Sequence, residues 1–564
     1  MKNGRFRQIL WPLGFLTALI FCAALLFTQA QQPSTSPFTE PENDGCTSIM
    51  VGRLASTDGS VMTAHTCDGG SFRNWLRVEP ARKNIPEGTM HKIYDGLMGT
   101  EFPGDMRRVR EKGEIPEATE TYAWVNASYP FMNDKGLAIG ETTISGRREL
   151  GNDEGMFMIE ELEHIALERC ATARDAIKLM GELATKYGYG DGAECLTVAD
   201  SKEVWQFEIM GGGAEQIGAV WAAVRIPDEN VGISANITRI SEIDLSKPDY
   251  YMASANVFSL AEKMGWYDSK KGEKFKFWKA YTTRRKAYDI REFYVLSTLA
   301  PSLNLTMDME ELPFSVKPEK KLSIKDVMKY YRETYEGTDY DLTKNMATVS
   351  PSGGGRGGFG GAQPPQTSTG QMVKPAFVSP WAIGKGGLSS YINSLKPGTI
   401  SSTRFIAIDG CAYSHIIQCR DGYPDGLKAV AWFSFDNPAL SPRIPIFSGT
   451  LSLPKSFEFS GQLQYREDSA TWWFRRTNRL ATNTLNWGQF RLLIEGSVKE
   501  FEDKALLELP QIEKIALDLY NQEKNAGKEP TEYKKYLTQY TNDFARAAMN
   551  KWWEIGNQIF WRLK

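Results

Sequence analysis

The amino-acid sequence predicts an α+β fold, and three observations carry this prediction. Short β-prone runs flank turn residues in the first half of the chain, hydrophobic residues at three- and four-residue spacing mark helices between them, and a helical pattern fills the C-terminal end. The chain has 564 residues, of which 41% are hydrophobic and 12% aromatic. This composition suffices for one large core or two domains and excludes a disordered protein.

The first 45 residues have the order of an export signal. Three basic residues among the first seven precede an uncharged apolar run over 9–27, and a polar stretch rich in Pro, Ser and Thr follows. The apolar run is longer than a usual signal core, so residues 1–30 are interpreted as a cleaved signal peptide or a signal anchor. Residues 31–45 form a leader without a core of its own. We therefore expect an exported protein that is periplasmic, at the cell surface or extracellular.

Charge, cysteine and histidine content exclude several classes of protein. Lys plus Arg total 66 and Asp plus Glu total 69, and this net charge of -3 gives no broad attraction for nucleic acid. The seven cysteines do not suit a disulfide scaffold, and Cys411 and Cys419 form either a bridge across a hairpin or two buried thiols. No CxxC pair occurs, and the four histidines lack metal-ligand spacing, so we expect neither a metal nor a cofactor. The histidines are His65, His91, His164 and His415.

The segment that begins at Cys46 predicts a β-hairpin. Two β-prone runs flank Asp58-Gly59, a dipeptide that favours a tight turn. A turn centred there places Ser71 opposite Cys46, so that Cys67 and Asp68 return to within a few residues of the start of the first strand. The hairpin is therefore expected to bring a carboxylate close to a thiol.

Further elements follow in order along the chain. A turn at Asn133–Gly136 leads into a strand, and helical spacing covers 156–169 and 173–187, the second helix opening at Thr172 and stopping at Gly188. Strands are expected within 194–209, 218–240, 403–410 and 426–436, with helical patches over 260–335 between them.

The remaining segments are a glycine-rich tract and a helical tail. The tract at 353–361 lacks the GK[ST] ending of a phosphate loop and is interpreted as a surface loop. The chain is expected to be helical from about residue 485. Near its end one stripe of apolar residues favours docking on the core over contact with a membrane; the stripe comprises Phe544, Ala548, Trp552, Ile555 and Ile559.

Five motifs follow one another over Cys46 to Gly449. They are GCTSIMVGRLASTDGS, MNDKGLAIGETT, ALERCATARDAIKLMGELATKYGYGDGAECLTVADSKEVWQFEI, WAAVRIPDENVGISANITRI and SPRIPIFSG. Together they resemble the dipeptidase A family of cysteine peptidases, which are N-terminal-nucleophile (Ntn) hydrolases. The resemblance implies a four-layered αββα catalytic domain over 46–484, a helical C-terminal extension over 485–564, and autocatalytic cleavage between Gly45 and Cys46. It also implies hydrolysis of small dipeptides.

The chemistry of cysteine supports Cys46 as the nucleophile. A thiol has a pKa near 8.5 and an α-amino group a pKa of about 7.7–8.0, so the amine of the same residue can accept the thiol proton near neutral pH. In the precursor this nitrogen belongs to the amide with Gly45. We expect the thiol to attack the Gly45 carbonyl in an N-to-S acyl shift, after which hydrolysis of the thioester frees the amine. Gly45 suits this step because it lacks a Cβ and tolerates a strained backbone.

Three further residues are expected close to the nucleophile. The resemblance implies that Asp68 orients the terminal ammonium and that Asn236 donates to the oxyanion of the tetrahedral intermediate. A turn aspartate and a strand-end asparagine are the plain alternatives. Related amidases have an arginine three residues before the aspartate, where this chain has His65. His65 either substitutes for that charge when protonated or is an ordinary strand histidine.

The expected substrate-binding residues lie on the strands around the pocket. Arg225 and Arg239 flank Asn236 and are candidates for a bidentate contact with a substrate carboxylate, or else structural ion-pair partners. Glu141 and Thr142, which end a strand bordering the pocket, are candidate wall residues.

The sequence thus predicts an exported cysteine dipeptidase that acts on small peptides. A first alternative keeps the fold but changes the bond: an acylase for acylated amines such as penicillin V or conjugated bile salts. A second alternative is a catalytically inactive exported binding protein. If residues 9–27 anchor the chain in a membrane, cleavage at Gly45 makes the anchoring transient.

Overall fold

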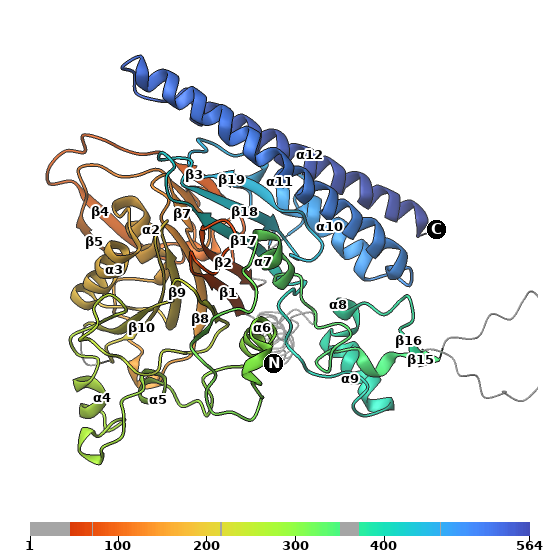
Figure 1. The fold of residues 1–564 in the computed structure, drawn as a ribbon, viewed down its shortest axis with the longest axis horizontal. Coiled ribbons are helices and arrows are strands. Elements are labelled where there is room, and N and C mark those ends of the chain that lie inside the picture. The colour runs from red at the N-terminus through yellow and green to blue at the C-terminus, as the bar shows by residue number, and fades with distance from the viewer. Residues whose placement is uncertain (1–44, 70–71, 215–216, 350–371, 463, 564) are drawn as a thin grey trace, which may run out of the picture. The chain divides into compact units, whose positions relative to one another are not determined.

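The computed structural model describes residues 45–69, 72–214, 217–349, 372–462 and 464–563. The predicted signal, the leader before Gly45 and the glycine-rich tract at 353–361 lie outside the described residues. Within them the predicted mixture of α and β structure is confirmed, with antiparallel sheets and a helical C-terminal region (Figure 1).

The larger part of the strands forms two antiparallel sheets. The first sheet contains, in spatial order, β14 (Ser315–Val316), β12 (Val231–Ser234), β1 (Gly45–Val51), β2 (Val61–Asp68), β17 (Cys411–Cys419), β18 (Ala429–Phe435) and β19 (Ile444–Phe447). The second sheet contains β13 (Tyr251–Ala253), β11 (Ala219–Arg225), β10 (Val204–Gly211), β9 (Ala193–Ala199), β8 (Ala138–Ile144), β7 (Met132–Asn133), β6 (Trp124–Asn126) and β3 (Arg77–Glu79). Two separate strand pairs are β4 (Met90–Asp95) with β5 (Arg110–Pro116) and β15 (Thr348–Val349) with β16 (Met372–Val373).

The described helices are spread over the chain and lengthen toward its C-terminal end. They are α2 (Ile159–Arg169), α3 (Ala173–Tyr187), α4 (Ser259–Lys263), α5 (Phe277–Tyr281), α6 (Ile290–Leu299), α7 (Ile324–Tyr330), α8 (Pro380–Ile383), α9 (Gly386–Leu395), α10 (Ala470–Thr482), α11 (Trp487–Asn525) and α12 (Glu532–Arg562). Short 3₁₀ turns occur at Leu97–Gly99, Arg148–Leu150, Ser269–Lys271, Pro301–Leu303, Lys344–Met346 and Lys455–Glu458.

The two sheets pack face to face between helices. Strands β1 and β2 of the first sheet contact β8 and β9 of the second, while α3 packs on β9, β10 and β11 and α10 and α12 pack on β18 and β19 (Figure 1). Side chains from both sheets and from these helices form one continuous apolar cluster, which includes the fully buried Trp205 and Trp552. The start of β1 therefore lies inside the packed layers.

The local signals for the paired helices are confirmed. Helix α3 has the predicted bounds, Thr172 accepts a hydrogen bond from the Asp175 N–H, and Gly188 ends the helix with a φ of 89°. Helix α2 begins three residues later than predicted, at Ile159. The backbone before Ile159 pairs with another segment instead of forming a helical turn. The N–H of Phe157 donates to Gly188 O, and the carbonyl of Phe157 accepts from the Gly190 N–H.

The hairpin of β1 and β2 is confirmed, but its predicted register is wrong. Cys67, not Ser71, lies opposite Cys46, and Asp68 lies opposite Gly45. Gly59 does turn, with a φ of 77°, but within a longer loop over 52–60. This loop is held from outside, since the N–H groups of 54 and 55 donate to Asp228 O at 2.8 and 3.0 Å. The shift brings Asp68 next to the predicted cleavage site.

The strand predicted at 403–410 is wrong, because the strand starts only at Cys411. The backbone of Ala407 is engaged by loops: its N–H donates to Glu333 O at 3.1 Å and its carbonyl accepts from Trp381 Nε1 at 2.6 Å. Cys411 and Cys419 are the two ends of β17, roughly 26 Å apart at the rise of a strand. A bridge between them is therefore excluded, and no disulfide forms among the described cysteines.

The helical C-terminal region begins at Ala470, earlier than the predicted position near 485. The apolar stripe of α12 is buried as predicted, and Trp552 Nε1 donates to Leu440 O at 3.0 Å. Docking on the core is thus confirmed. In the described part of the chain, no helix combines the length and apolar character needed to cross a membrane.

The docking of α12 is tested by two matched tryptophan substitutions. Trp552→Ala, at a fully buried side chain, is expected to lower the free energy of unfolding by about 3–5 kcal/mol. Trp561→Ala, on the same helix at a side chain that is 66% exposed, is expected to change it by less than about 0.5 kcal/mol. Urea denaturation of the two variants measures both values, and equal losses would contradict the docking.

Candidate active site

Cys46 is held on both sides of its Cα atom at the start of β1. Its backbone N–H donates to Asn236 Oδ1 at 2.9 Å, and its carbonyl accepts from Arg291 Nη1 at 2.7 Å. The residue is 1% exposed. The backbone nitrogen and the thiol of one residue are thus fixed together in a buried position.

Asn236 is a strained residue that faces the Cys46 nitrogen. It has a φ of 64°, a left-handed conformation that Asn tolerates better than most residues. Its Oδ1 accepts from Cys46 N and from Arg291 Nη2 at 2.8 Å, while its Nδ2 donates to Thr143 O at 2.7 Å. The carbonyl side of the amide therefore points at the nitrogen of the predicted nucleophile.

The glycine before Cys46 is required by a close approach. A Cβ on Gly45 would lie 2.6 Å from Asn236 Oδ1, closer than carbon and oxygen atoms can come. The backbone angle φ of Gly45 involves residue 44, which lies outside the described residues, so the expected backbone strain stays a prediction. Any larger residue would displace the asparagine that holds Cys46.

Arg291, which sequence reasoning missed, ties β1 to the segment after β12. It is the second residue of α6, whose start is fixed by a capping box between Asp289 and Glu292. The buried guanidinium also donates to Thr47 Oγ1 at 3.1 Å and to Ala235 O at 3.0 Å. The Asp-x-x-Glu pattern marks the helix in the sequence, but not which neighbour its first turn meets.

Asp68 pairs with a second arginine that the sequence did not indicate. Its Oδ2 accepts from Arg404 Nη2 at 2.8 Å and from Thr66 Oγ1 at 3.0 Å. Asp68 is fully buried, whereas the Arg404 side chain is 17% exposed. The structure therefore brings the predicted Asp68 to Cys46 in company with a partly accessible cation.

Tyr335 adds an unused hydroxyl to this cationic side. It is buried in a left-handed conformation with a φ of 59°, which is costly for an aromatic residue. Its hydroxyl has no hydrogen-bond partner among the described residues. Burial raises the pKa of Tyr335, although the charges of Arg291 and Arg404 act against this.

The end of β8, in the second sheet, also borders Cys46. Thr142 Oγ1 contacts Ser234 Oγ at 2.6 Å and so joins the two sheets, and Thr143 Oγ1 donates to Glu141 Oε1 at 3.2 Å. The Cys46 thiol, a ring nitrogen of His65 and a Glu141 oxygen all lie within 4.8 Å of one another. Of the two predicted wall residues, Glu141 is therefore the one that reaches the thiol.

Glu141 and Glu194 form a fully buried pair of carboxyl groups. Burial raises the pKa of Glu141 to about 7, and burial together with the charge of Glu141 raises the pKa of Glu194 well above its usual value. No donor among the described residues reaches Glu141 Oε2 or Glu194 Oε2. Burial, and next the charge of Glu141, raise the pKa of the Cys46 thiol.

His65 does not supply the charge of the arginine found in related amidases. Its Nδ1 lies 2.6 Å from Glu141 O, and burial lowers its pKa to about 4, so the ring is neutral near pH 7. The expectation that a protonated His65 replaces the arginine is therefore not supported. Positive charge reaches the site from Arg291 and Arg404 instead.

The two arginines predicted to bind a substrate carboxylate have other partners. Arg225 pairs with Asp228 at 2.7 Å and with Glu203 at 3.2 Å. Arg239 is buried and donates to the backbone carbonyls of 287 and 313. Neither guanidinium contacts the residues described above around Cys46.

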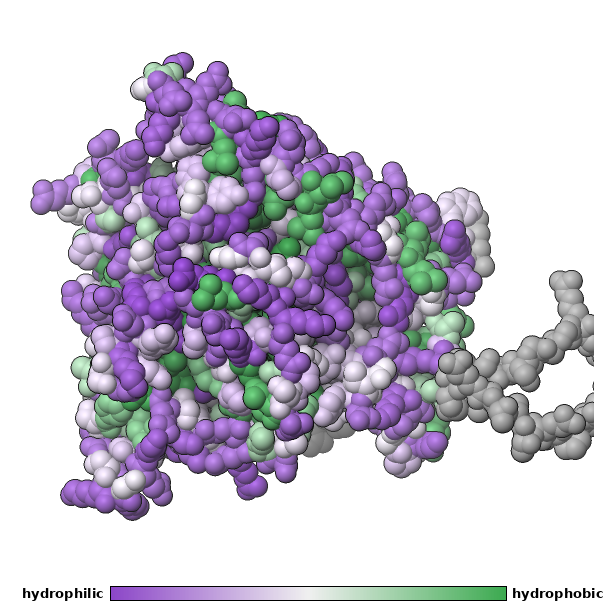
Figure 2. All heavy atoms as spheres, viewed as in Figure 1, coloured by the Kyte–Doolittle hydropathy of each residue, from purple (hydrophilic) through white to green (hydrophobic). Residues whose placement is uncertain are grey.

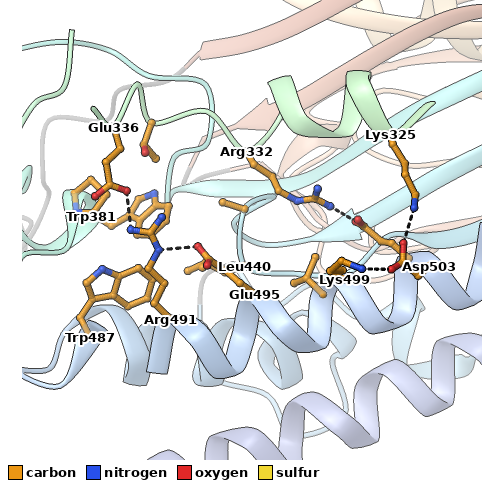
Figure 3. A pocket seen from close by; sticks show the side chains of 15 residues that line it. Lys325, Arg332, Glu336, Trp381, Leu440, Trp487, Arg491, Glu495, Lys499 and Asp503 are labelled. Atoms are coloured by element: carbon orange, nitrogen blue, oxygen red, sulfur yellow. Dashed lines mark hydrogen bonds and ion pairs between the residues drawn. The ribbon is translucent and has the colours of Figure 1, made fainter. Parts of the chain in front are cut away.

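A polar cavity of about 360 Å³ lies along α11 (Figure 3). Its charged side chains pair with one another: Arg491 with Glu336 at 2.6 Å and with Glu495 at 2.7 Å, and Lys325 with Asp503 at 2.5 Å. Cys46 does not line this cavity. The charges of these lining residues therefore compensate one another, and the predicted nucleophile is not part of the cavity.

Comparison with known proteins gives a consistent result. The model of peptidase family C69 matches residues 45–358 and 383–499, starting one residue before Cys46. A probable dipeptidase of Latilactobacillus sakei is 27% identical over 417 residues, covering 72% of this chain and 75% of the relative. A probable dipeptidase of Salmonella dublin is 26% identical over 426 residues (72% and 81%), and dipeptidase A of Lactobacillus helveticus is 22% identical over 487 residues (83% and 87%). The family match spans well over half of the sequence, and the chain belongs to peptidase family C69, the dipeptidase A family of cysteine peptidases.

Proposed function

We propose that this protein is an exported dipeptidase that cuts itself between Gly45 and Cys46 and then uses the amino-terminal Cys46 to hydrolyse dipeptides. The names of its relatives and its family support the peptidase activity. The observation that carries the mechanism is the contact of Cys46 N with Asn236 Oδ1 at 2.9 Å. It holds the nitrogen that cleavage would free, next to the thiol of the same residue.

Self-cleavage requires a base, because the Cys46 nitrogen is still an amide. The Cys46 thiol and a Glu141 carboxyl oxygen lie within 4.8 Å of one another, and the Glu141 pKa of about 7 suits proton transfer near neutral pH. After Glu141 takes the proton, the sulfur attacks the Gly45 carbonyl carbon and the C–N bond breaks as the nitrogen is protonated. Water then hydrolyses the thioester and releases the leader as a carboxylate.

In turnover the freed amine takes over as the base. An unperturbed α-amino group has a pKa of about 7.7–8.0, which suits accepting the thiol proton near neutral pH, and the thiolate then attacks the carbonyl carbon of the dipeptide. The resulting ammonium returns the proton to the departing amino acid, and water hydrolyses the acyl-enzyme. Asn236 Oδ1 orients the amine, and the N–H of Asn236 Nδ2 that Thr143 does not use is the proposed donor to the oxyanion.

The packing of helices, two sheets and helices supports assignment to the Ntn sandwich that the sequence predicts. Strands β1 and β2 are central in their sheet and face β8, which carries Glu141. The first residue of the mature chain thereby lies between the layers. Export is proposed from the first 45 residues alone, and cleavage at Gly45 would release the enzyme from any anchor formed by 9–27.

The charges around Cys46 match the two ends of a dipeptide. Glu141 Oε2 and Glu194 Oε2 accept no hydrogen bond from the described residues, which leaves one oxygen of each carboxyl for the substrate ammonium. The partly exposed Arg404 and the unused Tyr335 hydroxyl suit the substrate carboxylate. An acylated amine lacks the ammonium, so this arrangement favours a dipeptidase over an acylase.

The first prediction concerns self-cleavage. Cys46→Ala removes the nucleophile, so the chain is expected to retain its leader and to release no amino acids from a dipeptide. Gly45→Ala keeps the nucleophile but pushes Asn236 aside, and is expected to process at least about tenfold more slowly, a loss of about 1.4 kcal/mol. Intact mass spectrometry over time measures both, with wild type as the reference. Normal processing of Cys46→Ala would contradict the mechanism.

The second prediction concerns the substrate ammonium. Glu141→Gln is expected to lower kcat/KM for dipeptides roughly 10- to 100-fold, since a hydrogen bond to a charged group contributes about 1.5–3 kcal/mol. N-acetylated dipeptides should be poor substrates of wild type, and Glu141→Gln should lower their kcat/KM little further. Glu208→Gln is the control, because burial also raises the pKa of that carboxyl to about 7. Equal losses for both substrates would argue against Glu141 as the ammonium site. Only material that has already processed is assayed, because Glu141 is also proposed to act in self-cleavage.

The third prediction concerns the substrate carboxylate. Arg404→Gln is expected to reduce kcat/KM for a dipeptide about tenfold or more while sparing the C-terminally amidated dipeptide, which lacks that charge. Arg225→Gln, whose guanidinium pairs with Asp228, should leave the ratio of the two substrates unchanged. If the ratio of the two substrates changed in Arg225→Gln and not in Arg404→Gln, Arg225 rather than Arg404 would be the residue that binds the substrate carboxylate.

A further inference from the structure

Two histidines that are distant in the sequence meet between β4 and α2. His91 lies on β4 and His164 on α2, and their ring centroids are 5.0 Å apart. One ring nitrogen of each histidine and one oxygen of Glu161 lie within 4.8 Å of one another. Two imidazoles and a carboxylate are a common ligand set for Zn²⁺ and related divalent cations.

The second nitrogens of both rings face carboxylates. His91 Nδ1 lies 3.1 Å from Glu117 Oε2, and His164 Nε2 lies 3.3 Å from Glu168 Oε1. Histidines that bind metals usually donate their other N–H to a carboxylate, which fixes the ring and its tautomer. The arrangement therefore leaves His164 Nδ1 directed at the Glu161 side of the cluster.

The spacing on that side is longer than a charge-assisted hydrogen bond. His164 Nδ1 and Glu161 Oε2 are 3.5 Å apart, whereas a hydrogen bond between these groups is usually about 2.7–2.9 Å. Metal–ligand bonds of about 2.1 Å in a tetrahedral site hold neighbouring ligand atoms about 3.4 Å apart. This separation therefore suits ligands around a common ion.

Glu161 presents to the cluster an oxygen that accepts no hydrogen bond. The residue is 1% exposed, its Oε1 accepts from Tyr94 N at 3.3 Å, and its Oε2 has no hydrogen-bond partner among the described residues. His91, His164 and Glu161 all line a cavity of about 440 Å³, which provides entry and room for a further ligand. Leaving a buried carboxylate oxygen without a partner is unfavourable unless a cation or proton compensates.

The outer carboxylates have their own cations. Arg82 donates to Glu117 and to Glu168 at 3.0 Å each, and Arg169 donates to Glu117 at 3.2 Å. Neither arginine is paired with Glu161 in these contacts. The negative charge of Glu161 is therefore available to the two histidines and to what binds between them.

We propose that His91, His164 and Glu161 bind a divalent cation of the zinc class, which links the β4–β5 hairpin to α2. The ion joins two elements that are far apart in the sequence, so its effect is on the stability of the hairpin. The site is separate from Cys46 and does not depend on the proposed peptidase mechanism. The competing occupant is a proton on His164, which must be displaced for the metal to bind.

Titration of the purified, processed protein with Zn²⁺ near pH 8, followed by calorimetry and thermal unfolding, tests this site. Glu161→Gln and His91→Asn are expected to remove one binding event and the rise in Tm that Zn²⁺ causes in wild type. Glu117→Gln, which disturbs the carboxylate behind His91, should weaken binding roughly 10- to 100-fold. Glu111→Gln is the control, because Glu111 lies on the same hairpin but pairs with Lys92 on the surface.

Two further measurements keep the result unambiguous. Cys46, His65 and Glu141 are another set of possible ligands, so the titration is repeated with Cys46→Ala. This variant is expected to keep its leader but should retain the His91 site. Circular dichroism without metal confirms that each variant is folded. Absence of Zn²⁺ binding by Cys46→Ala, or wild-type binding by Glu161→Gln and His91→Asn, would overturn the proposal.

Discussion

The backbone of Cys46 is fixed by two side chains, and the rest of the site depends on this constraint. Asn236 accepts from its nitrogen and Arg291 donates to its carbonyl, while Arg291 also donates to Asn236. The three residues form a closed set of hydrogen bonds in a buried place, where each bond is stronger than in water. Gly45 lies against Asn236 so closely that no side chain fits. The nitrogen that cleavage would release is therefore in its working position beforehand.

Negatively and positively charged side chains both lie close to Cys46. Burial, and next the charge of Glu141, raise the pKa of the Cys46 thiol, so the thiol would be a poor nucleophile if its proton had to leave for bulk water. In the proposed mechanism the freed amine of the same residue removes that difficulty, because the proton moves only a short distance inside the site. In that proposal the buried carboxyl pair binds the ammonium of a zwitterionic substrate and Arg404 binds its carboxylate.

Much of the fold and part of the site could be predicted from the sequence. Local signals were sufficient for α3, where Thr172 and Gly188 set both ends, and for the buried stripe of α12. The motif context identified Cys46, Asp68, Asn236 and Glu141, which the structure brings together. The hairpin register was wrong because contacts with Asp228 from another segment lengthen the loop. Arg291, Arg404 and the meeting of His91 with His164 depend on tertiary packing, which no spacing along the chain records.

The central claim is that the nucleophile and its base belong to one residue, and trapping of the acyl-enzyme tests it most directly. Processed enzyme is mixed with a dipeptide, quenched in acid during turnover, digested and analysed by mass spectrometry. The account predicts a peptide that begins at Cys46 and carries the amino-terminal residue of the dipeptide as a thioester. An active enzyme whose Cys46 is still joined to Gly45, or whose acyl group is on another residue, would contradict it.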